Sequence, residues 1–222
     1  ILRLGAASRD ASALVDQRQR AIDGIAAIVP LREYTRENGT IALYSATGAA
    51  LLDGRAATLS FTRTPTITPD MTLASGALSG IAIDGRPVPV AGRSAPLAGG
   101  SLAAAFAVRD DLAVTAQARA DGLARDIVTR FQDPAADPSL APGAAGLFTD
   151  GAIAFDPLNE EGLAARLSVN AVADPARGGD LWRLRTGLGA AAPGPVGAAA
   201  LLASLAGAAS ALRPPASAAL PA

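Results

Sequence analysis

Carboxylates, guanidinium groups and hydroxyls are the side chains of this 222-residue protein that could carry chemistry. The chain contains 19 basic residues, all of them arginine, and 20 acidic residues, but no histidine and no cysteine. Imidazole and thiolate catalysis are therefore excluded, and the ligands that zinc and other transition metals prefer are missing. Only oxygen ligands for a hard ion such as Ca²⁺ or Mg²⁺ remain. We expect neither a metal centre nor another cofactor.

Adjacent acids occur at Asp110-Asp111 and Glu160-Glu161, and a pair of carboxylates is what glycoside hydrolysis requires. Neighbouring residues on a helix point about 100° apart, so neither pair can flank a sugar bond by itself. We therefore interpret both pairs as solvated surface. A secreted glycosidase that uses Asp110 and Glu160 is a minor alternative, and we expect no catalytic residues.

The remaining candidate sites also have simpler interpretations. Gly99-Gly100-Ser101 could present backbone N–H groups to a phosphate, but no Gly-Lys-Ser/Thr sequence follows, so we interpret it as a hinge with Ser101 as a helix N-cap. Trp182 either anchors a partner or fills the core, and we favour the core. The arginines are spread from Arg3 to Arg213 instead of forming a basic stripe, so we expect no nucleic-acid binding.

Helical and strand periodicities alternate along the first half of the chain. Residues 8–29 are rich in alanine, repeat apolar residues at helical spacing and end at Pro30, which predicts an amphipathic helix. The period changes to two in residues 31–98, which predicts β-hairpins. Their expected turns are Asn38-Gly39, Asp53-Gly54 and Asp84-Gly85-Arg86, the last of which joins a strand at Ile81/Ile83 to an edge strand at Val88/Val90.

Residues 101–131 predict the longest helix. Its apolar residues recur at spacings of three, four and seven, which indicates one buried stripe. The stripe consists of Leu102, Phe106, Ala113, Ala116, Ala120, Leu123, Ile127 and Phe131. The pairs Asp121/Arg125 and Asp126/Arg130 predict ion pairs on the exposed side. Arg109 interrupts the stripe, so the packing there is either frayed or includes a carboxylate partner.

The second half predicts fewer regular elements. A loop rich in proline and glycine leads to a short helix turning into a strand at 163–172 and to a strand or buried turn at 181–184. Residues 191–222 predict a small amphipathic helix and a flexible linker, because the apolar run Val196–Leu212 has too few large side chains for membrane insertion. The predicted fold is α+β, a bundle of long helices with the hairpins between them, and residues 1–190 form a single domain.

Several short motifs follow one another between Leu14 and Gly187. They are Leu14-Val15-Asp16-Gln17-Arg18, Asn38-Gly39-Thr40-Ile41, Gly48-Ala49-Ala50-Leu51-Leu52, Gly99-Gly100-Ser101-Leu102 with Arg109-Asp110 seven residues beyond, Asp121-Gly122-Leu123-Ala124, Gly143-Ala144-Ala145-Gly146-Leu147-Phe148 and Leu167-Ser168-Val169-Asn170. Their order and spacing resemble the flagellar hook-associated protein 1 family, the first hook–filament junction protein. The positions that we assign to the family motifs are structural, and they are Leu14, Asp16, Gln17, Arg18, Asn38, Gly39, Gly99, Gly100, Arg109, Asp110, Leu123, Gly143, Gly146, Phe148 and Asn170.

The resemblance implies a flagellar core-type domain and a structural, non-enzymatic subunit of the bacterial flagellum. Such a subunit is exported through the flagellar channel and assembles outside the cell between hook and filament. Its implied partners are other copies of itself in a ring, the hook protein, the second junction protein and an export chaperone, with no membrane insertion. The alternative is another axial protein, a flagellin-like filament subunit or a hook subunit, and copy number distinguishes these because a junction protein is scarce.

The chain departs from the family pattern in several ways, one of which is that Phe131-Gln132-Asp133 stands where the family usually has an asparagine-containing helix end leading to a histidine. Asp121-Gly122 replaces a more apolar helical stretch, and only a short interval separates Phe148 from Leu163, so we expect the large outer β-domain of many members to be absent. The chain begins at Ile1 without the terminal helices of the family, and we expect it to be a fragment. Because the resemblance implies that those termini drive polymerisation, we expect it to be monomeric in solution.

Overall fold

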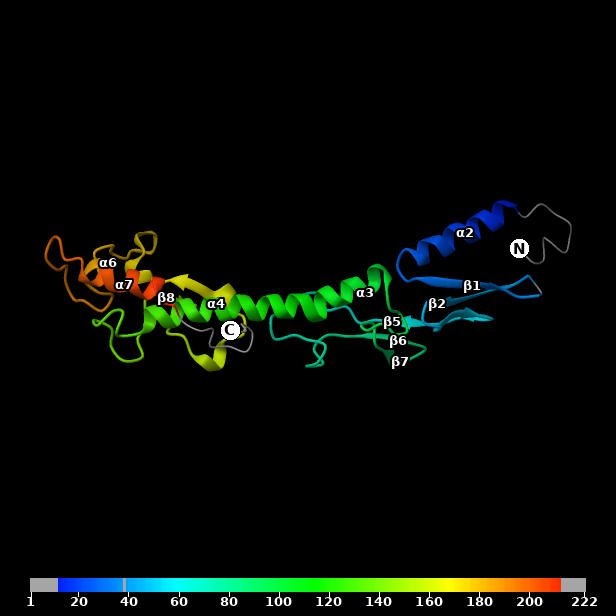
Figure 1. Ribbon diagram of the computed structural model, residues 1–222, viewed down its shortest axis with the longest axis horizontal. Coiled ribbons are helices and arrows are strands. Elements are labelled where there is room, and N and C mark those ends of the chain that lie inside the picture. The colour runs from blue at the N-terminus through cyan, green and yellow to red at the C-terminus, as the bar shows by residue number, and fades with distance from the viewer. Residues whose placement is uncertain (1–11, 38, 213–222) are drawn as a thin grey trace. The chain divides into compact units, whose positions relative to one another are not determined.

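The computed structural model describes residues 12–37 and 39–212 (Figure 1). Contacts divide the chain into two compact units, Ile1–Val114 and Thr115–Ala222. Each unit contains helices, a small antiparallel sheet and a buried core, so the predicted α+β class is confirmed. The bundle of long helices and the single domain over residues 1–190 stay predictions.

The first unit begins with helix α2 (Ser12–Ala26), and the part of the predicted helix before Ser12 lies outside the described residues. The four strands β1 (Leu31–Thr35), β2 (Ile41–Ser45), β3 (Ala50–Asp53) and β4 (Arg55–Ala56) then form an antiparallel sheet in sequence order. The predicted turns at Asn38-Gly39 and Asp53-Gly54 are confirmed, although Asn38 itself lies outside the described residues. Gly39 has a φ of 76°, which a glycine adopts without strain.

A second sheet completes the first unit, with β5 (Leu59–Ser60), β6 (Ile81–Ile83) and β7 (Arg86–Val88) in sequence order. The predicted hairpin is confirmed, with Ile81 paired to Val88, but Val90 lies beyond the end of β7. The turn is one residue shorter than expected because Arg86 already pairs with Ile83. β7 is an edge strand and contains Pro87, which has no N–H to donate. The core of this unit is a cluster of five buried residues, Val29, Ile81, Val90, Leu97 and Phe106.

The predicted long helix consists of three consecutive segments, α3 (Gly100–Ala107), a π-helical turn (Val108–Leu112) and α4 (Ala113–Gln132). The expected N-cap at Ser101 is wrong. Gly99 precedes the first helical residue, and the Ser101 hydroxyl, one residue inside the helix, donates a hydrogen bond of 3.2 Å to the Ala27 carbonyl. The backbone N–H of Leu102 donates to the Ile28 carbonyl at 3.2 Å, so the chain at the end of α2 satisfies a free N–H at the start of α3.

The predicted stripe along this helix is wrong in its second half. Ala113, Ala116 and Leu123 are exposed, and α4 buries a different set: Asp121, Gly122, Ala124 and Val128. A π-helical turn holds more residues than an α-turn, so it rotates the face that the following residues present. The predicted stripe holds only for an uninterrupted α-helix, so the face expected to be buried in α4 is the wrong one.

One of the two ion pairs predicted on this helix forms. Arg130 Nε lies 2.7 Å from Asp126 Oδ2, as expected. The pair Asp121/Arg125 is wrong, because Asp121 is buried and accepts backbone hydrogen bonds from residues 162 and 164, whereas Arg125 pairs with Glu160.

The second unit also contains a two-stranded sheet and several short helices. Its elements are β8 (Phe148–Asp150), α5 (Leu163–Arg166), β9 (Leu167–Val169), α6 (Arg183–Thr186) and α7 (Ala200–Ser210). The short helix turning into a strand and the small C-terminal helix are confirmed. Of the two alternatives at 181–184, the strand is wrong, because the Arg183 N–H donates to the Asp180 carbonyl and the chain forms a turn that leads into α6. This turn is only partly buried, since Leu181 is exposed. Trp182 is half-buried beneath the guanidinium of Arg183.

Candidate functional site

The motif residues at the start of the chain lie together on α2. Leu14, Asp16 and Gln17 are exposed there, and Arg18 is partly buried. The Nε of Arg18 is a buried nitrogen without a hydrogen-bond partner among the described residues. This motif therefore supplies helix surface.

Gly99 and Gly100 lie where the backbone passes close to the end of α2. Both have positive φ angles, 84° and 71°. A Cβ atom at Gly100 would overlap the carbonyl of Ile28, so only glycine fits there. The double glycine thus permits the contact between the two chain segments, and it does not form a phosphate cradle.

Arg109 and Asp110 occupy the π-helical turn and pair with each other. Arg109 also donates to the Ser79 carbonyl at 3.0 Å, and its guanidinium lies 4.5 Å from the centre of the Phe106 ring. Arg109 therefore joins the helix to the loop before β6. Asp110 and Glu160, the two acids of the glycosidase alternative, are each held by an arginine, because Glu160 pairs with Arg125 at 3.2 Å.

In the second unit, the structure brings the motif residue Asn170 to the loop that contains the motif residues Gly146 and Phe148. Asn170 Nδ2 donates to the Gly146 carbonyl at 2.9 Å, and the ring of Phe148 packs edge-on against Phe131 with centres 5.1 Å apart. A Cβ atom at Gly146 would overlap the Phe131 carbonyl. Gly143 lies in an open turn, and Leu123, 58% exposed, takes no part in this contact.

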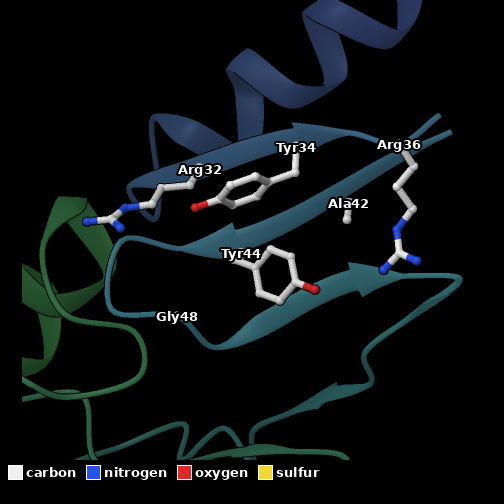
Figure 2. A pocket seen from close by; sticks show the side chains of 6 residues that line it. All are labelled: Arg32, Tyr34, Arg36, Ala42, Tyr44 and Gly48. Atoms are coloured by element: carbon white, nitrogen blue, oxygen red, sulfur yellow. The ribbon is translucent and has the colours of Figure 1, made fainter. Parts of the chain in front are cut away.

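The first unit carries a tyrosine-lined groove on its four-stranded sheet. It is a hollow of about 340 Å³ lined by Arg32, Tyr34, Arg36, Ala42, Tyr44 and Gly48. Figure 2 shows the two rings on the same face of the sheet, with an arginine toward either end. We call this feature the tyrosine groove.

Strand register explains why these residues share one face. Arg32 pairs with Tyr44 and Tyr34 pairs with Ala42, and directly opposed residues in an antiparallel sheet point to the same side. The Ala42 side chain is small and 1% exposed, so it forms a floor between the rings, which meet edge-on with centres 5.6 Å apart. The Tyr34 side is open, since that residue is 53% exposed.

The two ends of the tyrosine groove differ in charge. At one end Arg36 pairs with Asp53, and the Tyr44 hydroxyl donates to Asp53 Oδ2 at 2.7 Å. This hydrogen bond to a carboxylate raises the pKa of the Tyr44 phenol above its ordinary value. At the other end Arg32 is exposed, and its guanidinium has no hydrogen bond or ion pair among the described residues. The groove therefore carries one uncompensated positive charge at Arg32.

The tyrosine groove was not predicted from the sequence, although the sequence contains the pattern that predicts it. A hairpin centred on Asn38-Gly39 places Arg32 opposite Tyr44 and Tyr34 opposite position 42 by simple counting. Two tyrosines and an arginine on one face of a short hairpin then predict an exposed aromatic surface. Tyrosine and arginine rarely indicate a reaction by themselves, so catalytic spacing does not reveal this surface.

Comparison with known proteins gives one match. Residues 1–137 match the family described as the flagellar hook-associated protein FlgK helical domain. The chain belongs to this family. No curated protein and no solved structure matches the FlgK-family chain significantly.

Membership of the FlgK family agrees with the resemblance seen in the motifs and indicates a structural role in the flagellum. The FlgK family is a structural component of the bacterial flagellum and is not an enzyme family. The match ends at residue 137, so the loop motif at 143–148 and the returning segment at 167–170 lie beyond it. In the described part of the FlgK-family chain no helix is long and apolar enough to cross a membrane, and no group of three acidic side chains could hold a metal ion.

Proposed function

We propose that this chain is part of a subunit that joins the flagellar hook to the filament. The match to the FlgK helical domain over residues 1–137 is the observation that carries the proposal. In this function the protein is exported through the flagellar channel, forms a ring with other copies of itself, and contacts the hook protein on one side and the second junction protein on the other. An export chaperone would accompany it before assembly.

Local structure supports an adhesive role for this chain. The carboxylates of the glycosidase alternative are neutralised by arginines, whereas Tyr34 and Tyr44 line an open groove on a sheet. Open aromatic surfaces with arginine are typical of protein–protein contacts. In this function the motif glycines at positions 99, 100 and 146 allow the backbone to pass close to neighbouring segments. Residues 1–190 then form the core-type domain, in which the long helices pack as a bundle.

Deleting the parent gene and viewing the cells by electron microscopy tests this function. We expect hooks to remain, filaments to be lost and flagellin to be shed into the medium, with recovery when the gene is restored. Filaments that stay attached to swimming cells would contradict the proposal. Copy number in purified flagella separates a junction subunit from a filament or hook subunit, because only the latter two polymerise in long arrays.

A further inference from the structure

The second unit presents a protruding segment whose chemistry is complementary to the tyrosine groove. A tight 3₁₀ turn at Pro157–Asn159 follows Asp156, whose carboxylate accepts a hydrogen bond of 2.9 Å from the Leu158 N–H. Leu158 at its tip is 91% exposed, a large apolar side chain with almost no contact in its own chain. We call residues 156–161 the acidic knob.

Hydrogen bonds and an ion pair of Arg166 anchor the acidic knob to the rest of the second unit. Arg166 donates to the carbonyls of Asn159 and Glu161 while it pairs with Asp150 at 2.6 Å. Phe155, immediately before the knob, is buried in the core with Val128 and Leu163. The exposure of Leu158 is therefore fixed by its anchors, and little conformational freedom remains to be lost on binding.

Charge on the knob is negative after internal pairs are counted. Glu160 pairs with Arg125, and Asp150 pairs with Arg166, so these four charges balance. Asp156 and Glu161 remain, and Glu161 is exposed with no ion pair among the described residues. The knob therefore combines an exposed proline and leucine with two uncompensated carboxylates, whereas the tyrosine groove combines two rings with an uncompensated guanidinium.

We propose that the acidic knob of one copy of this chain docks in the tyrosine groove of the next copy. Pro157 and Leu158 cover the rings of Tyr34 and Tyr44, and Glu161 pairs with Arg32. Aromatic faces accept proline and aliphatic side chains, and an arginine at the rim selects a carboxylate. This inference rests on the proposed function, because it names the contact by which the subunits adjoin in their ring.

Such a contact has the right symmetry and strength for that ring. Knob and groove are different surfaces, so the contact is head-to-tail and can close into a ring after a fixed number of copies. A single knob covers less than the roughly 1,200–2,000 Å² of a stable interface. One contact is therefore weak, which agrees with a chain expected to be monomeric in solution, and it gains strength only when many copies are held side by side.

Disulfide trapping in assembled flagella tests the contact directly, and this chain has no cysteine of its own to interfere. Ala50 pairs with Tyr44 across the sheet and marks the groove, while Asn159 is an exposed residue of the knob. Oxidised flagella carrying the parent protein with Ala50→Cys and Asn159→Cys should yield a ladder of covalent oligomers. The control pairs Ala50→Cys with Ala206→Cys, an exposed position on α7, and should yield no ladder. Junctions that contain the protein but give no ladder with the first pair would overturn the proposal.

Charge reversal supplies a second, independent test. Arg32→Glu and Glu161→Arg should each reduce the number of attached filaments by about tenfold or more, since like charges then face each other. The double variant restores the opposite pair and should recover most filaments. Arg93→Glu, which reverses an exposed arginine elsewhere in the first unit, is the control and should leave the filaments unchanged.

The outcomes distinguish failure of the contact from failure of the function. If Arg32→Glu weakens attachment but Glu161→Arg neither weakens nor rescues it, the groove binds an acidic segment of a different protein and the knob contact is wrong. If all charge variants behave normally in cells whose filaments depend on the parent gene, the contact is again wrong and the junction function stands. If deletion of the gene leaves filaments attached, both the junction function and the contact between knob and groove are wrong.

Discussion

The buried carboxylate of Asp121 accepts a hydrogen bond of 2.8 Å from the backbone N–H of Gly162. Its other oxygen accepts one of 2.8 Å from the Ala164 N–H and one of 2.9 Å from Gln117 Nε2. Asp121 is 3% exposed, so these contacts are protected from water. One side chain of α4 thereby satisfies free N–H groups at the start of α5 and fixes the base of the acidic knob.

Removing this carboxylate should destabilise the second unit strongly. We expect Asp121→Ala to lower the free energy of unfolding by about 3 kcal/mol or more, because it leaves buried N–H groups without acceptors. Trp182 is the one tryptophan and lies in the second unit, so its fluorescence in urea reports this loss. Asp126→Ala is a control on the same helix and should cost less, about 1 kcal/mol, because Asp126 is 39% exposed and accepts no backbone hydrogen bond, although its partner Arg130 is only 11% exposed. Equal effects of the two substitutions would contradict a capping role for Asp121.

The role of Asp121 also marks the limit of the sequence reading. Turns, strands and helix ends depend on neighbouring residues, so Asn-Gly and Pro signals located them to within a few residues. Which face of α4 is buried depends on what packs against it, and that partner comes from residues 155–167, far along the chain. The π-helical turn at Val108–Leu112 also rotates the buried face of the helix that follows it, and no local sequence pattern predicts this turn. A carboxylate within a polar-looking stretch was therefore read as surface.

The interaction surface was predictable only in part, for a related reason. Register from one hairpin turn suffices to place Tyr34 and Tyr44 on the same face. The state of each arginine is not local, because Arg36 is neutralised by Asp53 from another strand while Arg32 is left unpaired. Exposure of Leu158 likewise depends on the buried Phe155 and the ion-paired Arg166 that support its turn. The sequence therefore predicts which side chains share this surface. Which of their charges remain unpaired depends on contacts that only the folded chain makes.

A methyl group at Gly146 should disrupt the second unit. The added Cβ of Gly146→Ala would overlap the Phe131 carbonyl, and backbone on both sides must move to relieve it. We expect a loss of about 2–3 kcal/mol in unfolding free energy, again measured by Trp182 fluorescence. Gly207→Ala in α7 is the control, because nothing lies within 4 Å of its Cβ position. The control should stabilise the helix by about 0.5–1 kcal/mol, so a neutral result at Gly146 would show that the contact is looser than described.

The phenol of Tyr44 should titrate above its ordinary range. Its hydroxyl donates to Asp53, and this hydrogen bond, with burial and the nearby negative charge, raises the pKa of Tyr44 from 10.0. Tyr34→Phe leaves Tyr44 as the remaining tyrosine, so the ultraviolet absorbance of the phenolate reports it alone. Adding Asp53→Ala should return the pKa toward 10.0. An unchanged titration after that substitution would show that the hydrogen bond does not hold the proton.

The hydrogen bond between Tyr44 and Asp53 also determines whether the stability of the protein rises or falls with pH. The folded protein binds the Tyr44 proton more tightly than the unfolded chain does. The stabilisation is therefore complete below the unfolded pKa of about 10 and is lost as the pH rises through the raised folded value. Unfolding followed by circular dichroism should show a steeper loss of stability in this range for Tyr34→Phe than for the Tyr34→Phe/Asp53→Ala protein. Identical slopes would contradict the linkage.

Arg109 and Asp110 should behave as a coupled pair in the first unit. Each side chain is 18% exposed, so removing one partner leaves a poorly hydrated charge. We expect Arg109→Met to cost about 2 kcal/mol, part of it from the lost bond to the Ser79 carbonyl. Asp110→Asn should be less harmful in the Arg109→Met background than in the original chain, with a coupling energy of about 1–2 kcal/mol in a double-mutant cycle followed by thermal unfolding. Additive effects would show that Arg109 acts through Ser79 and Phe106 alone, and that the π-helical turn is held by packing without the ion pair.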